Sequence, residues 1–246
     1  MRTMIVVPTY NERENLPNFV DAIFALEVPN LEVLVVDDNS PDGTGNLAEE
    51  LRAQYDQRVH VLHRAEKQGL GPAYIAGFRE ALAHNADYIV QMDADFSHQP
   101  KYILTMLEMI ERYDLVLGSR FMKGGGVDES WSAYRKLLSV WAKRIDTPLI
   151  LRLPVVYATG GFKMWKRDTL IGMNLDRIKS NGYVFQVEMT YVAHRLGYKI
   201  GEFPIYFPDR QHGSSKMSSK VALEAAARVW QILARHQALK PKDRTS

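Results

Sequence analysis

The sequence lacks several features that mark common protein classes. It contains no cysteine, so disulfides and thiolate chemistry are excluded, and any metal must be held by oxygen or nitrogen atoms. No apolar run approaches the roughly 18 residues that a membrane-spanning helix requires. The first residues lead directly into a strand-like run rather than a signal-peptide pattern. We therefore expect a cytoplasmic protein, or one peripheral on the cytoplasmic face of a membrane, without a transmembrane domain.

Common nucleotide-binding and nucleophile motifs are also missing. After the first expected strand, Pro8-Thr9-Tyr10-Asn11-Glu12 stands where a dinucleotide-binding fold carries G-x-G-x-x-G, which disfavours a Rossmann oxidoreductase. The sequence has no P-loop with its Lys-Ser/Thr pair, and no G-x-S-x-G nucleophile elbow. No recognised nucleic-acid-binding motif is present, so we expect no nucleic-acid partner.

The charge of the chain is divided unevenly along its length. The 246 residues are 46% hydrophobic and 24% charged, values typical of one large globular domain or a domain with an appendage. Residues 1–115 hold 9 Lys/Arg against 19 Asp/Glu, whereas residues 116–246 hold 22 against 10. This asymmetry indicates two differently charged partners: a cation with a nucleotide on the acidic side, and an anionic acceptor or membrane surface on the basic side.

Short apolar runs alternate with segments of helical periodicity. The runs predict strands at 4–7, 31–36, 59–62, 88–92 and 115–118, with helices of 10–15 residues between them. This alternation predicts an α/β fold of the Rossmann-like kind, with a mostly parallel sheet flanked by helices on both faces. Beyond it we expect a helix at 134–151, a strand at 159–165, a helix at 183–196, a strand at 200–207 broken by Pro204, and a C-terminal amphipathic helix to about 237 with a frayed tail from residue 240.

Ligands in such folds bind outside the carboxyl ends of the strands. By that rule, the segments that follow the strands or open the next helix should meet at one edge of the sheet, the rim. Each of them is polar or contains glycine: 8–12, 37–38, 69–71, 93–97 and 119–120. We expect the site at this rim.

Asp93-Ala94-Asp95 follows the expected strand at 88–92. Because strand side chains alternate between faces, we expect Asp93 and Asp95 on one face. Two carboxylates there repel unless a cation lies between them, and hard oxygen ligands favour Mg²⁺ or Mn²⁺. The alternative is a solvated loop in which an Asp caps the next helix, and the triplet by itself leaves both interpretations open.

Other rim residues also have two interpretations. Asp37 and Asp38 end a strand, where a carboxylate can accept hydrogen bonds from base N–H groups or ribose hydroxyls; the alternative is turn chemistry ahead of residues 40–43, and we favour the ligand role for one of the two. Glu12 fits backbone capping and ribose binding equally. Gly69 and Gly71 are expected in a tight turn at a helix start, close to a phosphate.

Taken in order, these segments resemble family 2 glycosyltransferases of GT-A fold, first through residues 7–16 and 37–44. Six later segments narrow the resemblance to dolichyl-phosphate (polyprenyl-phosphate) mannosyltransferases: 69–74, 93–100, 118–120, 159–163, 182–188 and 213–216. The resemblance covers about residues 4–220. It implies a catalytic domain at 1–220, with a nucleotide-sugar-binding half at 1–118 and an acceptor-binding half at 119–220, followed by the helix and tail at 221–246.

The resemblance implies inverting transfer of mannose from GDP-mannose to a polyprenyl (dolichyl) phosphate. Asp93 and Asp95 would hold Mg²⁺ or Mn²⁺ against the diphosphate, and Ser97 stands where relatives often carry a glutamine that reaches the metal. The residues implied to bind the nucleotide sugar are Pro8, Tyr10, Glu12, Asp37, Asp38, Gly69, Asp93, Ala94 and Asp95.

An acceptor phosphate has a second pKa of about 6, so much of it is a dianion that can attack without a protein base. Catalysis then reduces to positioning and charge stabilisation, which calls for Arg or Lys. The residues that match the family's phosphate contacts are Arg120, Arg135, Arg210 and Lys216; Asp95, Arg120, Arg210 and Lys216 are the catalytic candidates. The alternatives to phosphate binding are that Arg120 forms a structural ion pair with a rim Asp, and that Arg135 is a solvated residue of a helix.

Two alternative functions stay open: transfer of another sugar, such as glucose from UDP-glucose, to a lipid phosphate or protein, and a non-catalytic nucleotide-sugar-binding subunit. Membrane contact is expected through small membrane-anchoring subunits or through amphipathic surfaces. Such surfaces would contain Trp131, Tyr134 and Trp141, or Trp230 in the last helix, for which core packing is the alternative.

Overall fold

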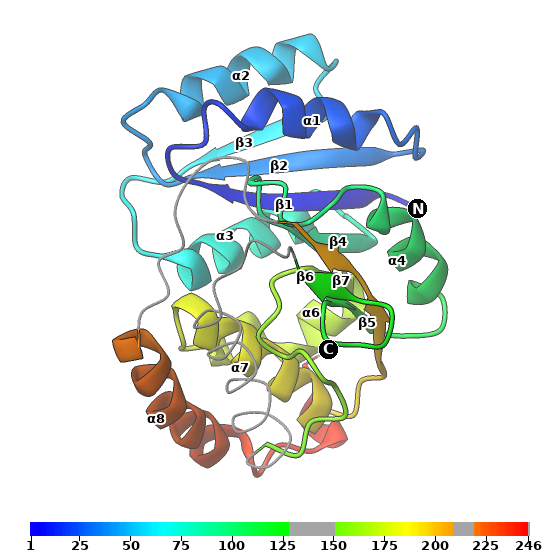
Figure 1. The fold of residues 1–246 in the computed structure, drawn as a ribbon, viewed down its shortest axis with the longest axis vertical. Coiled ribbons are helices and arrows are strands. Elements are labelled where there is room, and N and C mark those ends of the chain that lie inside the picture. Colours follow the sequence, from blue (N-terminus) through cyan, green and yellow to red (C-terminus); the bar gives the residue numbers. More distant parts are fainter. Residues whose placement is uncertain (128–150, 209–218, 246) are drawn as a thin grey trace.

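The computed structural model describes residues 1–127, 151–208 and 219–245 (Figure 1). The helix expected at 134–151 falls almost entirely outside these residues. So do three of the four candidate phosphate contacts, Arg135, Arg210 and Lys216.

The first half of the chain alternates strands and helices as expected. Its strands are β1 (Thr3–Thr9), β2 (Leu31–Asp37), β3 (Val59–His63), β4 (Tyr88–Gln91) and β5 (Leu115–Ser119). Its helices are α1 (Leu16–Phe24), α2 (Thr44–Gln54), α3 (Leu70–Ala83) and α4 (Tyr102–Ile110). Most residues of β1, β2, β4 and β5 are buried, which explains why these strands are continuous apolar runs.

The second half departs more from the predicted pattern. The strand expected at 159–165 is the shorter β7 (Lys163–Lys166), and it continues into a helix that was not expected, α6 (Arg167–Met173). The expected break near Pro204 is confirmed by two strands, β8 (Ile200–Pro204) and β9 (Tyr206–Phe207). The remaining elements are β6 (Gly126–Val127), η2 (Leu175–Arg177), α7 (Gly182–Arg195), α8 (Ser219–His236) and η3 (Pro241–Asp243).

The main sheet has the order β3-β2-β1-β4-β7-β5-β8, and β6 pairs with β9 separately. All its neighbouring strands are parallel except β7, which is antiparallel to both β4 and β5. The prediction of a mostly parallel sheet is therefore confirmed, with β7 as the reversed strand. β2 and β4 lie on opposite sides of β1, so the chain turns in opposite directions after β1 and β4, and a crevice forms where such a sheet reverses its order.

Helices cover both faces of the sheet and give the protein two cores (Figure 1). α1, α2 and α4 pack on one face, with Phe19 and Ile103 among their buried residues. α3, α6, α7 and α8 pack on the other, where Tyr74, Trp165 and Phe185 are buried. The site described below lies at the strand ends between these layers.

The C-terminal residues do not fray, contrary to expectation. Arg244 Nε donates a hydrogen bond to the Leu196 carbonyl (2.9 Å), and Thr245 N donates to the Gly172 carbonyl (3.0 Å). Asp243 accepts a bond from the Lys240 backbone (2.8 Å) within η3. The tail is thereby fastened to α6 and to the end of α7.

Glu188 is a buried acidic residue that ties α7 to α8. Its carboxylate accepts hydrogen bonds from His236 Nε2 (2.8 Å), Arg235 Nη1 (2.7 Å), and the backbone amides of Lys179 (2.9 Å) and Ser180 (2.7 Å). Burial alone would raise the pKa of Glu188, but the bond from His236 and those from Ser180 and Lys179 outweigh it and lower the pKa to about 2. The ionised carboxylate therefore stabilises the packing of α8.

We expect the pH dependence of folding to report this pair of helices. A depressed carboxyl pKa gives stability that is complete above the unfolded pKa of 4.5 and is lost as pH falls towards 2. Glu188→Gln should lower the free energy of unfolding by about 3 kcal/mol at pH 7 and by clearly less at pH 3, as measured by urea unfolding. The exposed Glu108→Gln is the matched control. Equal losses at both pH values would contradict this account.

Candidate active site

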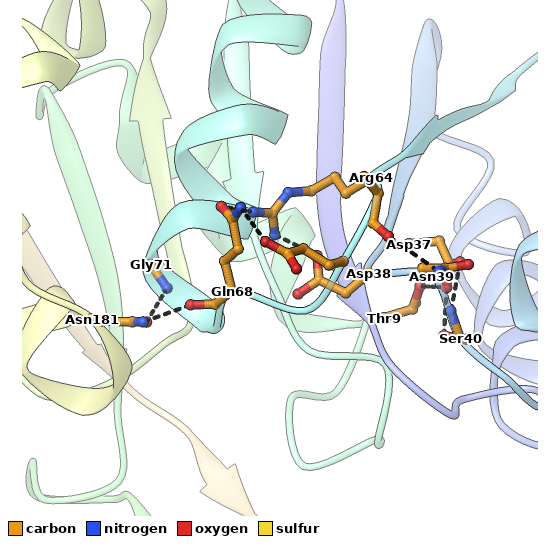
Figure 2. A network of polar contacts seen from close by, with 11 residues as sticks. Thr9, Asp37, Asp38, Asn39, Ser40, Arg64, Gln68, Gly71 and Asn181 are labelled. Atoms are coloured by element: carbon orange, nitrogen blue, oxygen red, sulfur yellow. Dashed lines mark hydrogen bonds and ion pairs between the residues drawn. The ribbon is translucent and has the colours of Figure 1, made fainter.

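The loops that follow β1, β2 and β3 are joined by hydrogen bonds at the rim (Figure 2). Thr9 Oγ1 donates to Asp37 Oδ1 (3.1 Å), and Asp38 N donates to the Thr9 carbonyl (3.1 Å). Arg64 N, just past β3, donates to the Asp37 carbonyl (2.8 Å). Three of the rim segments expected from the sequence are thus held in one array.

Asp37 and Asp38 point to different surroundings (Figure 2). Asp37 accepts bonds from Ser40 N (3.1 Å) and Ser40 Oγ (2.5 Å), the contacts expected of a turn. Asp38 pairs with the Arg64 guanidinium, which also donates to Gln68 Oε1 (3.0 Å). Burial, the largest influence, raises the pKa of Asp38 despite the opposing effect of Arg64. A ligand role for either carboxylate stays a prediction.

Asn181, at the start of α7, fastens the start of α3 (Figure 2). Its Oδ1 accepts bonds from Gly71 N (3.0 Å) and Gly182 N (2.7 Å), while its Nδ2 donates to the Gln68 carbonyl (2.8 Å). Gly69 adopts a φ of +102°, and a Cβ there would lie 2.4 Å from Asn181 Nδ2. Glycine is therefore required at Gly69 both by its conformation and by the closeness of Asn181.

The Asp93-Ala94-Asp95 triplet lies in a loop, since β4 ends at Gln91. The strand-alternation argument for its carboxylates was therefore wrong in its geometry. The helix-capping alternative is wrong as well: α4 has Lys101 at its N-cap and no side-chain cap. Asp95 instead accepts bonds from Ser97 N (3.1 Å) and from the Ser97 hydroxyl, in a tight turn where Phe96 has a φ of +58°.

Tyr74 of α3 fixes Asp93. The buried phenol donates a hydrogen bond to Asp93 Oδ1 (2.8 Å). Burial, together with the charges of Asp93 and Asp95, raises the pKa of Tyr74 well above its usual value, so the hydroxyl stays a donor. The contact with Tyr74 therefore fixes Asp93 relative to α3.

His98 binds the backbone of the loop that carries Asp93. Asp93 N donates to His98 Nδ1 (3.2 Å), so a neutral His98 carries its proton on Nε2. Its ring stacks on Phe162 with centroids 5.1 Å apart. The side chain of Asp93 remains 34% exposed, which leaves the carboxylate accessible to a ligand.

The oxygen atoms of Asp93, Asp95 and Ser97 are a donor set that suits Mg²⁺ or Mn²⁺. In the structure the Ser97 hydroxyl donates to Asp95, so its role as a third ligand stays a prediction. Another group, Glu32, His60 and His84, brings three ligand atoms within 4.8 Å of one another elsewhere in the described chain. There Arg2 Nε lies 3.0 Å from Glu32, and the group forms an ion-pair cluster away from the rim.

The predicted nucleoside-binding residues after β1 lie on the exposed side of this rim. Tyr10 is exposed, and Lys67 Nζ lies 3.5 Å from its ring centroid. Pro8 and Glu12 are half-buried. Glu12 accepts a bond from Asn15 Nδ2 (2.8 Å) just before α1, a contact between two side chains. Binding of a nucleoside by these residues stays a prediction.

Arg120 follows β5 and lies among aromatic rings. Its guanidinium carbon is 5.0 Å from the Phe121 centroid, 4.8 Å from that of Tyr157 and 5.0 Å from that of Phe207. Phe207 also contacts the His98 ring edge-on, at 5.5 Å. These rings connect Arg120 to the loop that carries Asp93, so the structure brings the two predicted groups to one region.

Sequence reasoning missed Tyr74, His98 as a partner of Asp93, and Asn181. Asn181 could have been found as a helix N-cap, because asparagine before a helix start is a common signal. Its bonds to residues 68 and 71, and the pairing of Tyr74 with Asp93, join segments that are distant in sequence, so no local pattern contains them.

The sheet order and the acidic loop at its reversal define an α/β fold of the GT-A type. Two solved structures share it: glucosyl-3-phosphoglycerate synthase of Mycobacterium tuberculosis with Mn²⁺, UDP and glucosyl-3-phosphoglycerate (TM-score 0.64, 19% identity, 96% of this chain and 80% of that one), and mannosyltransferase PcManGT of Pyrobaculum calidifontis with GDP-Man and Mn²⁺ (TM-score 0.59, 16% identity, 95% and 75%). At these identities the likeness concerns the fold alone.

Sequence similarity then identifies the family. The model of glycosyl transferase family 2 matches residues 4–172, and the chain belongs to this family. It is 46% identical over 244 residues (98% of this chain, 99% of the relative) to a Micrococcus luteus protein named undecaprenyl-phosphate mannosyltransferase. It is 41% identical over 237 residues (95% and 88%) to the polyprenol monophosphomannose synthase of Mycolicibacterium smegmatis. The chain is a glycosyltransferase.

Asn181→Ala tests the connection between α3 and α7. The variant loses an N-cap and two bonds to the start of α3, so its free energy of unfolding should fall by about 1–2 kcal/mol in urea titrations. The exposed Asn18→Ala in α1 is the control and should change little. A loss no greater than that of the control would contradict the role assigned to Asn181.

Proposed function

We propose that the protein transfers mannose from GDP-mannose to a polyprenyl phosphate, with inversion at the sugar carbon and with Mg²⁺ or Mn²⁺ as cofactor. The observation that carries the proposal is the 46% identity, over almost the whole chain, to a protein named undecaprenyl-phosphate mannosyltransferase. The acidic loop at the reversal of the sheet supports it, because its carboxylates suit a cation that accompanies a diphosphate.

On the donor side, Asp93 and Asp95 would hold the cation, with Ser97 as a further ligand. The cation would supply neutralisation of the charge that develops on the departing diphosphate. Tyr74 keeps Asp93 oriented. The hydrogen-bonded residues Asp37, Asp38 and Arg64 would form the surface on which the nucleoside lies. The other proposed nucleotide contacts are Pro8, Tyr10, Glu12, Gly69 and Ala94.

On the acceptor side, Arg120 would bind the lipid phosphate. An oxygen of the phosphate dianion attacks the anomeric carbon from the face opposite the diphosphate; the new carbon–oxygen bond forms as the bond to GDP breaks, and no proton has to move. The guanidinium of Arg120 is planar and lies beside the Tyr157 ring, 4.8 Å from its centroid, and a planar guanidinium suits bidentate binding of phosphate. Arg135, Arg210 and Lys216 are proposed to complete this site.

The lipid acceptor implies contact with a membrane, proposed to be at its cytoplasmic face. No helix in the described ranges is long and apolar enough to span a bilayer. In α8, Val229 and Ile232 are buried, whereas Trp230 is exposed. The core-packing alternative therefore does not apply to Trp230, and we propose it as a peripheral membrane contact, with small membrane-anchoring subunits as the other route.

A donor panel tests the proposal. The purified protein is incubated with a polyprenyl phosphate, Mg²⁺ or Mn²⁺, and either GDP-mannose or UDP-glucose, and the glycolipid is measured. We expect product from GDP-mannose, loss of product with EDTA, and a decrease of at least about 100-fold in Asp95→Asn. Product from UDP-glucose instead of GDP-mannose would establish the alternative donor and refute the proposal.

Arg120→Lys tests the acceptor site. Lysine keeps the charge but loses the planar guanidinium and its stacking, so the KM for polyprenyl phosphate should rise about tenfold or more, with the KM for GDP-mannose nearly unchanged. The exposed Arg112→Lys, just after α4, is the control. Steady-state kinetics that showed a change only in the donor KM would remove Arg120 from the acceptor site.

A further inference from the structure

A cluster of three polar side chains lies beneath the Asp93 loop. Gln91 of β4 and Lys163 of β7 are paired in the sheet register, and Gln186 projects from α7. Gln91 and Lys163 are fully buried and Gln186 is 2% exposed. None of the three belongs to the predicted site, and a buried polar group is costly unless its bonds are satisfied, so the cluster requires an explanation.

Lys163 has an unusual set of partners. Its Nζ donates to the Gln186 carbonyl (2.8 Å), to Gln186 Oε1 (3.0 Å) and to the Ala158 carbonyl (3.5 Å). It forms no ion pair with a carboxylate of the described chain, and burial lowers its pKa well below the usual value. Burying an amine is costly unless its bonds are satisfied, and two of the three bonds of Lys163 go to Gln186, which favours a role in orienting Gln186.

The amide of Gln186 has its direction fixed by its neighbours. Lys163 Nζ donates to Gln186 Oε1, and Gln91 Nε2 also donates to this oxygen (2.6 Å). The oxygen of the amide must therefore face Lys163 and Gln91, and its nitrogen must face the other way. Gln186 Nε2 donates to no residue of the described ranges.

The Gln186 nitrogen borders the space left by the missing side chain of Gly161, called the hollow below. A Cβ placed on Gly161 would lie 3.6 Å from Gln186 Nε2, 3.8 Å from Asp93 Oδ2 and 3.4 Å from His98 Cε1. An amide donor and one of the proposed metal-binding carboxylates thus border the same small space, which exists because residue 161 has no side chain. The group that enters there must accept a hydrogen bond close to the cation and diphosphate.

We propose that Gln186 binds a hydroxyl of the hexose to be transferred, and that Lys163 is a positioning residue that keeps the Gln186 amide nitrogen directed at that sugar. The inference rests on the proposed function and deepens it. The charged diphosphate is matched by the cation and by Arg side chains, whereas a neutral amide suits a neutral hydroxyl. The hexose is the part of a nucleotide sugar that adjoins the diphosphate, and it must lie between Asp93 and Arg120 for transfer.

Binding measurements separate a sugar contact from a structural role. Affinities of GDP-mannose and of GDP are measured by calorimetry with Mg²⁺ for the full chain and for Gln186→Ala. The variant should bind GDP-mannose about tenfold more weakly, the loss expected for one hydrogen bond, and GDP as well as wild type does. Gln54→Ala, at the exposed end of α2, should leave both affinities unchanged.

Two further variants test the same contact in case Gln186→Ala does not fold. Gly161→Ala places a methyl group in the hollow at ordinary contact distances, so it should fold normally and weaken only GDP-mannose binding. Lys163→Met removes one of the two donors to Gln186 Oε1, and should weaken GDP-mannose binding while leaving GDP binding intact.

Equal losses of GDP and GDP-mannose binding in Gln186→Ala would show a structural role and overturn the proposal, as would no loss of either. If the donor panel identifies a UDP-sugar, the same comparison is made between that sugar nucleotide and UDP. The proposed donor can then fail while the assignment of Gln186 is still decided, because the measured quantity is the contribution of the hexose.

Discussion

Asp93 and Asp95 stand two residues apart in the loop that follows a buried strand, and hydrogen bonds from the surrounding structure orient them. Tyr74 donates to Asp93 from α3, Ser97 closes a turn on Asp95, and the Asp93 amide is bonded to His98. These bonds orient the carboxylates but leave Asp93 partly exposed. The oxygen atoms of this loop are of the kind that Mg²⁺ or Mn²⁺ binds, which is why the proposed function places the cation there.

Helix α3, which carries Tyr74, is bonded to the second half of the chain. Asn181 bonds the start of α3 to the start of α7, and Glu188, two turns farther along α7, bonds the same loop through the amides of Lys179 and Ser180. Glu188 is also the residue that attaches α8. The C-terminal helix is therefore coupled, through a short series of hydrogen bonds, to the helix that orients Asp93.

The acidic and basic halves of the sequence contribute different elements to the candidate site. The acidic first half contributes the strands β1 to β4 and the carboxylates at their ends. The basic second half contributes β7, α7 and the elements around Arg120. β7 is inserted in reverse between β4 and β5, and it brings Lys163 against Gln91 and Gly161 against Asp93. This reversed strand is what joins the two halves at the site.

The sequence by itself determined the strands of the first half, the mostly parallel sheet, the rim at the carboxyl ends and the acidic triplet, because strand periodicity and turn residues are local properties of the chain. It did not determine the antiparallel direction of β7, the order of the C-terminal tail or the partners of Asp93. Those features arise from contacts such as Tyr74 with Asp93, Asn181 with Gly71 and Lys163 with Gln186. Each depends on which surfaces pack together, so only the tertiary structure decided them. The triplet Asp93-Ala94-Asp95 illustrates both contributions. Its residue types, read from the sequence, suggested a cation site, whereas the loop that holds the carboxylates and the residues that orient them were decided by tertiary packing.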